Sequence, residues 1–175
     1  SNLLSVNNYE TNCATIFSYE TDNPNRYGIV ELDNNNKILS IEEKPKKPKS
    51  SLAVTGLYLY DSKAPDICKK LKPSKRGELE ITDLNRIYLD IGELENVKLD
   101  KSFLWLDSGT HDSLVEASNF VCETQKKHNK IIACLEEISF KKGWIDTDML
   151  KLSIKENKNK LGEYLNKILL NQYDC

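Results

Sequence analysis

The sequence lacks the cysteine pattern of a disulfide framework or of a zinc site. Its five cysteines are scattered, odd in number and free of any C-x-x-C pair: Cys13, Cys68, Cys122, Cys134 and Cys175. Disulfide-rich secreted proteins and zinc sites instead show paired, regularly spaced cysteines. Only two histidines are available as further ligands, so we expect no tetrahedral metal site. The pattern predicts reduced, mostly packed thiols in a cytoplasmic protein.

Long apolar runs and a surplus of positive charge are missing too. No run approaches the ~18 apolar residues that span a bilayer, and no charged-then-apolar signal segment opens the chain. The net charge of -2 argues against a dedicated nucleic-acid binder, which would carry a basic surplus. We therefore expect neither a membrane nor a nucleic acid as partner. The opening SNLLSVNNYETN has no initiator Met and resembles the middle of a protein, so we expect a truncated chain.

The first hundred residues carry the periodicity of β-strands. Alternation in CATIFSY (13–19) predicts a first strand, and GIVEL and KILSIEE flank the turn residues DNNN as in a hairpin. LAVTGLYLYD is almost continuously apolar, which predicts a central strand buried on both faces. ELENVKL and FLWLD are expected to form two further strands.

Helical spacing separates and follows these strands. Pro65 is expected early in a short helix, and ELEITDLNRIYLDIG predicts an amphipathic helix that ends at Gly92. A long helix is expected after SGT, with Ser108 or Thr110 as N-cap, and three shorter helices after it. Interleaved strands and helices predict an α/β fold. We place its boundary at residue 130 and a helical C-terminal region over 131–175.

The EEKP turn is the first candidate site. Lys44 is a compact cation that suits a phosphate, and the carboxylate of Glu43 can accept hydrogen bonds from sugar hydroxyls. Glu-Glu-Lys at the end of a strand is also ordinary surface chemistry, and by itself the pattern favours a solvated turn. Arg76 in the loop KPSKRGE has two similar interpretations. Its guanidinium could form a bidentate pair with phosphate oxygens, or it could be a solvated surface charge.

The segment WLDSGTHDS is the second candidate. Asp107 leaves an apolar stretch just before a helix, where open α/β sheets keep their ligand crevices. Its carboxylate could bind Mg²⁺. Alternatively, Asp107, Ser108 and Thr110 simply cap the helix, and the pattern alone favours this second reading. His111 is expected to be exposed and not to act as a general base.

Together these segments resemble one family, the glucose-1-phosphate thymidylyltransferases that open dTDP-L-rhamnose synthesis. The matching blocks occur in the family's order: RYGIVELD, SIEEKPKKPKS, AVTGLYLYD, KPSKRGELEITDLNRIYL, WLDSGTHDSLVEASNFV and IACLEEISFKKGWID. The resemblance runs from Ala14 to Tyr164 but begins partway into the family pattern, without its glycine-rich nucleotide loop and its G-D-N segment. It implies part of a Rossmann-like nucleotidyltransferase with a mixed sheet.

The resemblance also implies a reaction and roles for single residues. The family joins glucose 1-phosphate and dTTP into dTDP-glucose and releases pyrophosphate, with Mg²⁺ as cofactor. Lys44 and Arg76 would be the catalytic cations on the sugar phosphate, and Glu43 would receive sugar hydroxyls. Gly28 and Val54 would offer backbone groups, Tyr58 and Trp105 would line the pocket, and Asp107 would bind Mg²⁺. Without the missing segments, we expect this chain alone to be inactive.

A regulatory nucleotide site and a homo-oligomer, a tetramer in the family, are implied in the same way. Ala133, Glu137 and Ile138 match part of the regulatory site. Lys101 stands where the family usually has arginine, and lysine cannot reproduce a planar fork. Two other readings stay open from the sequence: a non-catalytic sugar-phosphate-binding or regulatory module, and a related enzyme that uses UTP or ATP.

Overall fold

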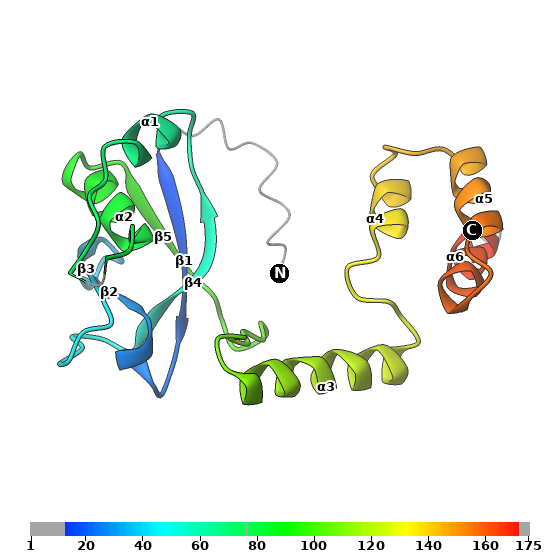
Figure 1. Ribbon diagram of the computed structural model, residues 1–175, viewed down its shortest axis with the longest axis horizontal. Helices are drawn as coiled ribbons and strands as arrows, with labels where there is room; N and C mark the ends of the chain where they lie inside the picture. Colours follow the sequence, from blue (N-terminus) through cyan, green and yellow to red (C-terminus); the bar gives the residue numbers. More distant parts are fainter. Residues whose placement is uncertain (1–12, 76, 172–175) are drawn as a thin grey trace. The chain divides into compact units, whose positions relative to one another are not determined.

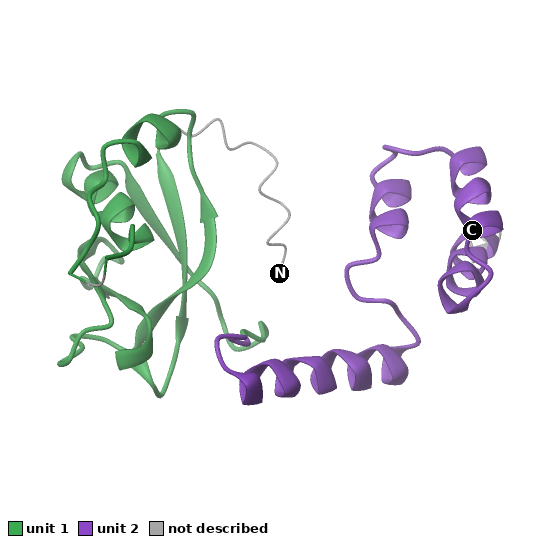
Figure 2. Ribbon diagram, in the orientation of Figure 1, with its two compact units in different colours: residues 1–105 green, residues 106–175 purple. Residues whose placement is uncertain are grey.

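The computed structural model describes residues 13–75 and 77–171. Contacts divide the chain into two compact units, residues 1–105 and 106–175 (Figure 2). The change predicted after residue 130 therefore falls inside the second unit, because the long helix that follows the sheet groups with the later helices. The two units are described in turn.

The first unit is built on a five-stranded mixed sheet (Figure 1). Its strands are β1 (Ala14–Glu20), β2 (Gly28–Leu32), β3 (Ile38–Glu43), β4 (Leu52–Leu59) and β5 (Leu94–Lys98), in the order β3-β2-β4-β1-β5. Only the β1–β5 pair is parallel, and the other neighbours are antiparallel. The mixed α/β sheet predicted from the sequence is confirmed.

The β2–β3 hairpin forms where DNNN predicted it. The Asp33 carboxylate accepts hydrogen bonds from the backbone N–H groups of Asn35 and Lys37, each at 2.8 Å. Asn36 takes the left-handed conformation, with φ of 63°. Asparagine tolerates this region better than most residues do, so the turn chemistry is local. It aligns Gly28 at the start of β2 with Glu43 at the end of β3.

Strand β4 is central, as predicted, but the prediction that both its faces are buried is wrong. Ala53 is fully buried, whereas Leu57 is 44% exposed. Between the pairs Ile16–Tyr58 and Ser18–Val54 the register shifts, so the three residues 55–57 stand opposite the single residue Phe17. Gly56 sits in this bulge with φ of 84°. A bulge lifts its residues out of the regular pleat, which explains the exposure.

The strand predicted over FLWLD is also wrong. Residues 103–107 make no strand pairing. Instead, the Trp105 indole N–H donates a hydrogen bond of 3.1 Å to the Thr55 carbonyl in the β4 bulge. A side chain, and not a backbone ladder, thus holds this extended segment to the sheet.

The helices of the first unit are η2 (Pro24–Arg26), α1 (Ala64–Cys68) and α2 (Ile81–Asp90). Helix α2 packs Leu84 and Tyr88 against Ala14 of the sheet. It ends as predicted before Gly92, which has φ of 74°. The packing fixes the first turn of α2 beside the end of β3.

The second unit is helical, with α3 (His111–His128), α4 (Leu135–Lys141), α5 (Thr147–Glu156) and α6 (Lys160–Asn171). Thr110 caps α3 in a reciprocal capping box with Ser113, and the Asp146 carboxylate caps α5. Helices α4 to α6 share a core that includes Leu150 and Leu165, both fully buried. Within the part of the chain that the structure describes, no helix is long and apolar enough to cross a membrane.

Candidate functional site

Three elements meet at the carboxyl end of β3. Gly28 begins β2 and pairs with Glu43, the last residue of β3. Thr82, in the first turn of α2, donates a hydrogen bond of 2.6 Å from its hydroxyl to Oε2 of Glu43. A Cβ atom added at Gly28 would lie 3.2 Å from both of these oxygens. Glycine therefore leaves the room in which the carboxylate and the hydroxyl meet.

Lys44 follows directly and has an unusual backbone. Its φ is 43°, a left-handed conformation that glycine adopts more readily than lysine. Its backbone N–H donates to the carbonyl of Tyr27 at 3.0 Å, while its side chain is exposed. Pro45 beside it is buried and anchors the turn. The turn thus holds a solvent-facing ammonium one residue from the Glu43 carboxylate.

Aromatic rings lie near this turn. The ring centroid of Trp105 lies 4.7 Å from that of Tyr27 and 6.1 Å from that of Tyr19. Burial, and secondly the negative charge of Glu43, raise the pKa of Tyr58, which places its phenol within electrostatic reach of that carboxylate. Tyr58 packs on the core cluster that contains Val54. The first unit therefore gathers a carboxylate, a cation and aromatic side chains around the end of β3.

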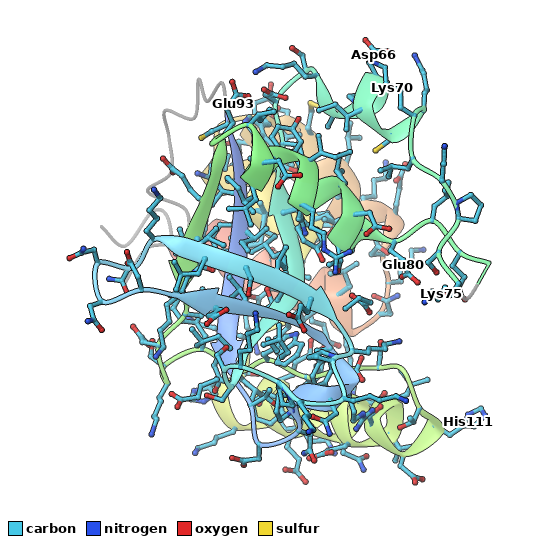
Figure 3. The ribbon with its side chains drawn as sticks, turned by 90° about the vertical axis from the view of Figure 1, so that its left-hand side faces the viewer. Asp66, Lys70, Lys75, Glu80, Glu93 and His111 are labelled. Atoms are coloured by element: carbon cyan, nitrogen blue, oxygen red, sulfur yellow. The ribbon has the colours of Figure 1, made fainter. Side chains whose placement is uncertain are left out.

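Arg76 lies outside the described residues, but the loop around it is structured. The backbone carbonyl of Ser74 accepts a hydrogen bond from the Gly77 N–H. The Ser74 hydroxyl donates a hydrogen bond of 2.9 Å to the Glu80 carboxylate. Figure 3 shows Lys75 and Glu80 on this loop, which leads into α2. The position predicted for Arg76 at the sugar phosphate stays a prediction.

Asp107 belongs to the second unit, and its predicted role as a Mg²⁺ ligand also stays a prediction. Its carboxylate accepts a hydrogen bond of 3.2 Å from the Gly109 N–H. The N-cap of α3 is Thr110, whose hydroxyl accepts from the Ser113 N–H at 3.2 Å. His111 is exposed at the start of α3, as predicted, and points outward in Figure 3. Nowhere among the described residues do three acidic, histidine or cysteine side chains form a cluster able to hold a metal.

The residues predicted for the regulatory site fall in different units. Lys101 lies in the first unit, and Ala133, Glu137 and Ile138 lie in the second. Ala133 is exposed with φ of 55°, and Ile138 is 41% exposed. The structure brings Glu137 into a pocket of about 560 Å³, whose lining includes Lys130, Lys141, Tyr164 and Lys167.

Glu137 is held by two neighbours that sequence reasoning did not assign to a site. Lys141 donates to its carboxylate at 2.5 Å, and the Tyr164 hydroxyl donates to its other oxygen. Partial burial raises the pKa of Glu137, but these two hydrogen bonds and the positive charges of Lys141 and Lys130 together outweigh it and hold the pKa below its ordinary value. Burial, and then the bond to Glu137, raise the pKa of Tyr164 to about 12. The helical spacing of apolar residues around Tyr164 is typical of a core residue. In the structure Tyr164 also belongs to the buried cluster that contains Leu150 and Leu165.

Thr82, which contacts Glu43, is the residue that sequence reasoning did not assign to the candidate site. Its partner Glu43 lies 39 residues earlier in the chain. The segment ELEITDLN shows only that a helix begins near Thr82, and nothing in that pattern signals a contact with EEKP.

The first unit is an α/β domain whose mixed sheet presents a carboxylate and a lysine at the end of β3. Residues 3–124 match the model of the nucleotidyl transferase family, and the chain belongs to this family. The chain spans about half the length of the curated relatives it matches.

Those relatives carry one specific name, glucose-1-phosphate thymidylyltransferase. The protein from Neisseria meningitidis is 51% identical over 161 residues, covering 91% of this chain and 56% of the relative. The one from Xanthomonas campestris is 52% identical over 153 residues, covering 87% and 52%.

Solved structures agree with this fold. A Bacillus anthracis structure described as a glucose-1-phosphate thymidylyltransferase in complex with sucrose matches at 50% identity and a TM-score of 0.55, covering 62% of this chain and 43% of that one. UDP-glucose pyrophosphorylase bound to UDP-glucose matches at 24% identity and a TM-score of 0.56, over 64% of this chain and 45% of that one, and shows the fold alone.

Proposed function

We propose that this chain is the sugar-phosphate- and Mg²⁺-binding part of a glucose-1-phosphate thymidylyltransferase. The observation that carries the proposal is the pair Glu43 and Lys44 at the end of β3, framed by Gly28 and Thr82. This pair offers an acceptor for sugar hydroxyls one residue from a cation for the phosphate. The specific name shared by relatives about half identical to the chain supports the same choice.

In the proposed reaction, a phosphate oxygen of glucose 1-phosphate attacks the α-phosphorus of dTTP. A new P–O bond forms, the bond to pyrophosphate breaks, and no covalent enzyme intermediate is needed. Catalysis then rests on positioning and charge neutralisation. Lys44 and Arg76 hold the attacking phosphate, and Glu43 orients the sugar. The backbone of Gly28 and Val54 and the rings of Tyr58 and Trp105 complete the pocket in this proposal.

Asp107 fits the role of one magnesium ligand. Mg²⁺ usually keeps several waters and takes one or two protein carboxylates together with substrate phosphates. A partly exposed carboxylate in a turn therefore suits this ion, whereas a single carboxylate would not suit a metal that needs a full protein cage. When bound, Mg²⁺ would neutralise phosphate charge. Asp107 would supply one oxygen to it.

Three further parts of the proposal concern feedback regulation, the oligomeric state, and the cellular compartment and pathway. Glu137, with Ala133, Ile138 and Lys101, would contribute to a second nucleotide site for feedback control. The working enzyme would be a homo-oligomer. It would act in the cytoplasm, in dTDP-rhamnose biosynthesis, and the unpaired thiols of Cys13, Cys68, Cys122 and Cys134 suit a reducing compartment.

Binding of glucose 1-phosphate to the full chain tests the proposal directly. We expect saturable binding at millimolar ligand, followed by NMR shifts of the amides at Gly28, Glu43 and Lys44. Glucose without phosphate and inorganic phosphate serve as matched ligands, and each should bind more weakly than the sugar phosphate. No saturable shift at these amides would overturn the proposed site.

A further inference from the structure

The hydroxyl of Thr82 is buried and directed at Glu43. Thr82 is only 2% exposed, and its hydroxyl donates to Oε2 of Glu43 at 2.6 Å. Threonine in a helix usually bonds to the carbonyl one turn earlier or faces solvent. Here it reaches a carboxylate on a strand that lies far away in the sequence. A short bond to a carboxylate of this kind is stronger than a bond between neutral groups.

The surroundings leave this pair little freedom. Gly28 faces both atoms so closely that a Cβ there would lie 3.2 Å from each. The bond also lies in the first turn of a ten-residue helix, where exposed backbone N–H groups favour a nearby negative charge. Together these features hold the Glu43 side chain in one position before any ligand arrives.

We propose that Thr82 is a positioning residue, whose hydroxyl fixes the Glu43 carboxylate to receive the hydroxyls of a sugar 1-phosphate. This inference rests on the proposed function and deepens it. A flexible glutamate would lose side-chain freedom on binding, and this loss would weaken affinity. A glutamate already held by Thr82 has lost that freedom during folding. Thr82 therefore contributes to affinity without touching the ligand.

Helix α2 offers a matched control. Arg86, one turn further along α2, donates from Nε to the carbonyl of Ile41 at 3.0 Å. It joins the same helix to the same strand, but it does not touch Glu43. A merely structural role of Thr82 predicts equal effects from both residues, whereas positioning of Glu43 predicts an effect from Thr82 alone.

The test measures binding of glucose 1-phosphate and of inorganic phosphate to the full chain and to Thr82→Val, Thr82→Ser and Arg86→Gln. We expect Thr82→Val to weaken glucose 1-phosphate binding severalfold, up to about tenfold, because Glu43 would then lose its side-chain freedom on binding. Inorganic phosphate binding should not change. Thr82→Ser, which keeps the hydroxyl, and Arg86→Gln should bind glucose 1-phosphate like the parent chain.

A double-mutant comparison isolates the route through Glu43. Thr82→Val should cause no further loss in a Glu43→Ala chain, because there is no side-chain oxygen left to position. An additive loss would overturn the inference, as would failure of Thr82→Ser to restore binding or an equal loss in Arg86→Gln. If Thr82→Val does not fold, Thr82→Ser and the Arg86→Gln comparison decide the question.

The same data separate this inference from the proposed function. If the parent chain binds glucose 1-phosphate and Thr82→Val binds it equally well, only the role of Thr82 is overturned. If the parent chain does not bind glucose 1-phosphate, the proposed function falls and the inference falls with it.

Discussion

At the scale of single residues, Lys44 combines backbone strain with a charged side chain. A non-glycine residue in the left-handed region costs about 1–2 kcal/mol, and Lys44 has φ of 43°. Its exposed side chain makes no packing contribution that would offset this cost. Strain of this kind often persists at functional sites. In the proposed function, the ammonium that binds the phosphate is the reason for a lysine at this position.

We predict that Lys44→Gly raises stability and weakens ligand binding in the same protein. Glycine relieves the left-handed backbone, so the free energy of unfolding should rise by up to about 1 kcal/mol. Loss of the cation should weaken glucose 1-phosphate binding at least about tenfold, as expected for a charge-assisted hydrogen bond. Denaturant unfolding and ligand titration measure the two effects.

Lys47→Gly is the matched control, because Lys47 is exposed in the same basic turn. It should leave glucose 1-phosphate binding unchanged. Equal loss of binding in Lys44→Gly and Lys47→Gly would mean that the turn attracts anions only through its overall charge. Unchanged binding in Lys44→Gly would remove Lys44 from the site.

At the scale of elements, the turn before α3 contains two residues with different expected roles: Thr110, which caps the helix, and Asp107, the candidate metal ligand. Thr110 forms the capping box of α3 with Ser113. Asp107 lies three residues before Thr110, and its carboxylate accepts a hydrogen bond from the Gly109 N–H. Thr110→Ala should lower the free energy of unfolding by about 1 kcal/mol, as N-cap removal usually does. Asp107→Asn should not, because an amide oxygen can still accept from the Gly109 N–H. Urea unfolding followed by circular dichroism measures both.

The second half of this prediction concerns Mg²⁺. Asp107→Asn should weaken Mg²⁺ binding to the chain in the presence of a nucleotide, while Thr110→Ala should leave it unchanged. If Asp107→Asn destabilises the protein as much as Thr110→Ala and leaves Mg²⁺ binding intact, Asp107 serves the helix start and not a metal.

Local chemistry explains which elements the sequence could predict. The hairpin at DNNN, the N-cap at Thr110 and the end of α2 before Gly92 depend on residues within a few positions of one another. The bulge in β4 and the irregular path around Trp105 depend on pairings with distant segments. No local pattern encodes such pairings, so β4 looked like an uninterrupted buried strand and residues 103–107 looked like another strand.

In the candidate site, too, the residues of a local motif could be predicted and the residue that makes a long-range contact could not. Glu43 and Lys44 were predicted because their motif is contiguous and belongs to a known family pattern. Thr82 was missed because its contact with Glu43 spans 39 positions and joins a strand to a helix. The raised pKa of Tyr58 has the same origin, since burial and the Glu43 charge arise only when β3 and β4 lie in one sheet.

At the scale of the whole molecule, the chain carries the proposed sugar-phosphate site but spans about half of its relatives. We predict that the chain alone gives no turnover of dTTP and glucose 1-phosphate. A fusion with the part of the Neisseria meningitidis relative that lies outside the alignment should give turnover, because the aligned parts are 51% identical and should support the same fold. Release of pyrophosphate measures the rate.

The fusion with Lys44→Ala is the control that assigns the activity to this chain. It should lower kcat/KM for glucose 1-phosphate at least about a hundredfold, because misplacing or losing a group that positions a reactant commonly has an effect of this size. Turnover by the unfused chain would contradict the idea that it is one part of the enzyme. If Lys44→Ala does not change the turnover of the fusion, Lys44 at the end of β3 does not contribute to the reaction.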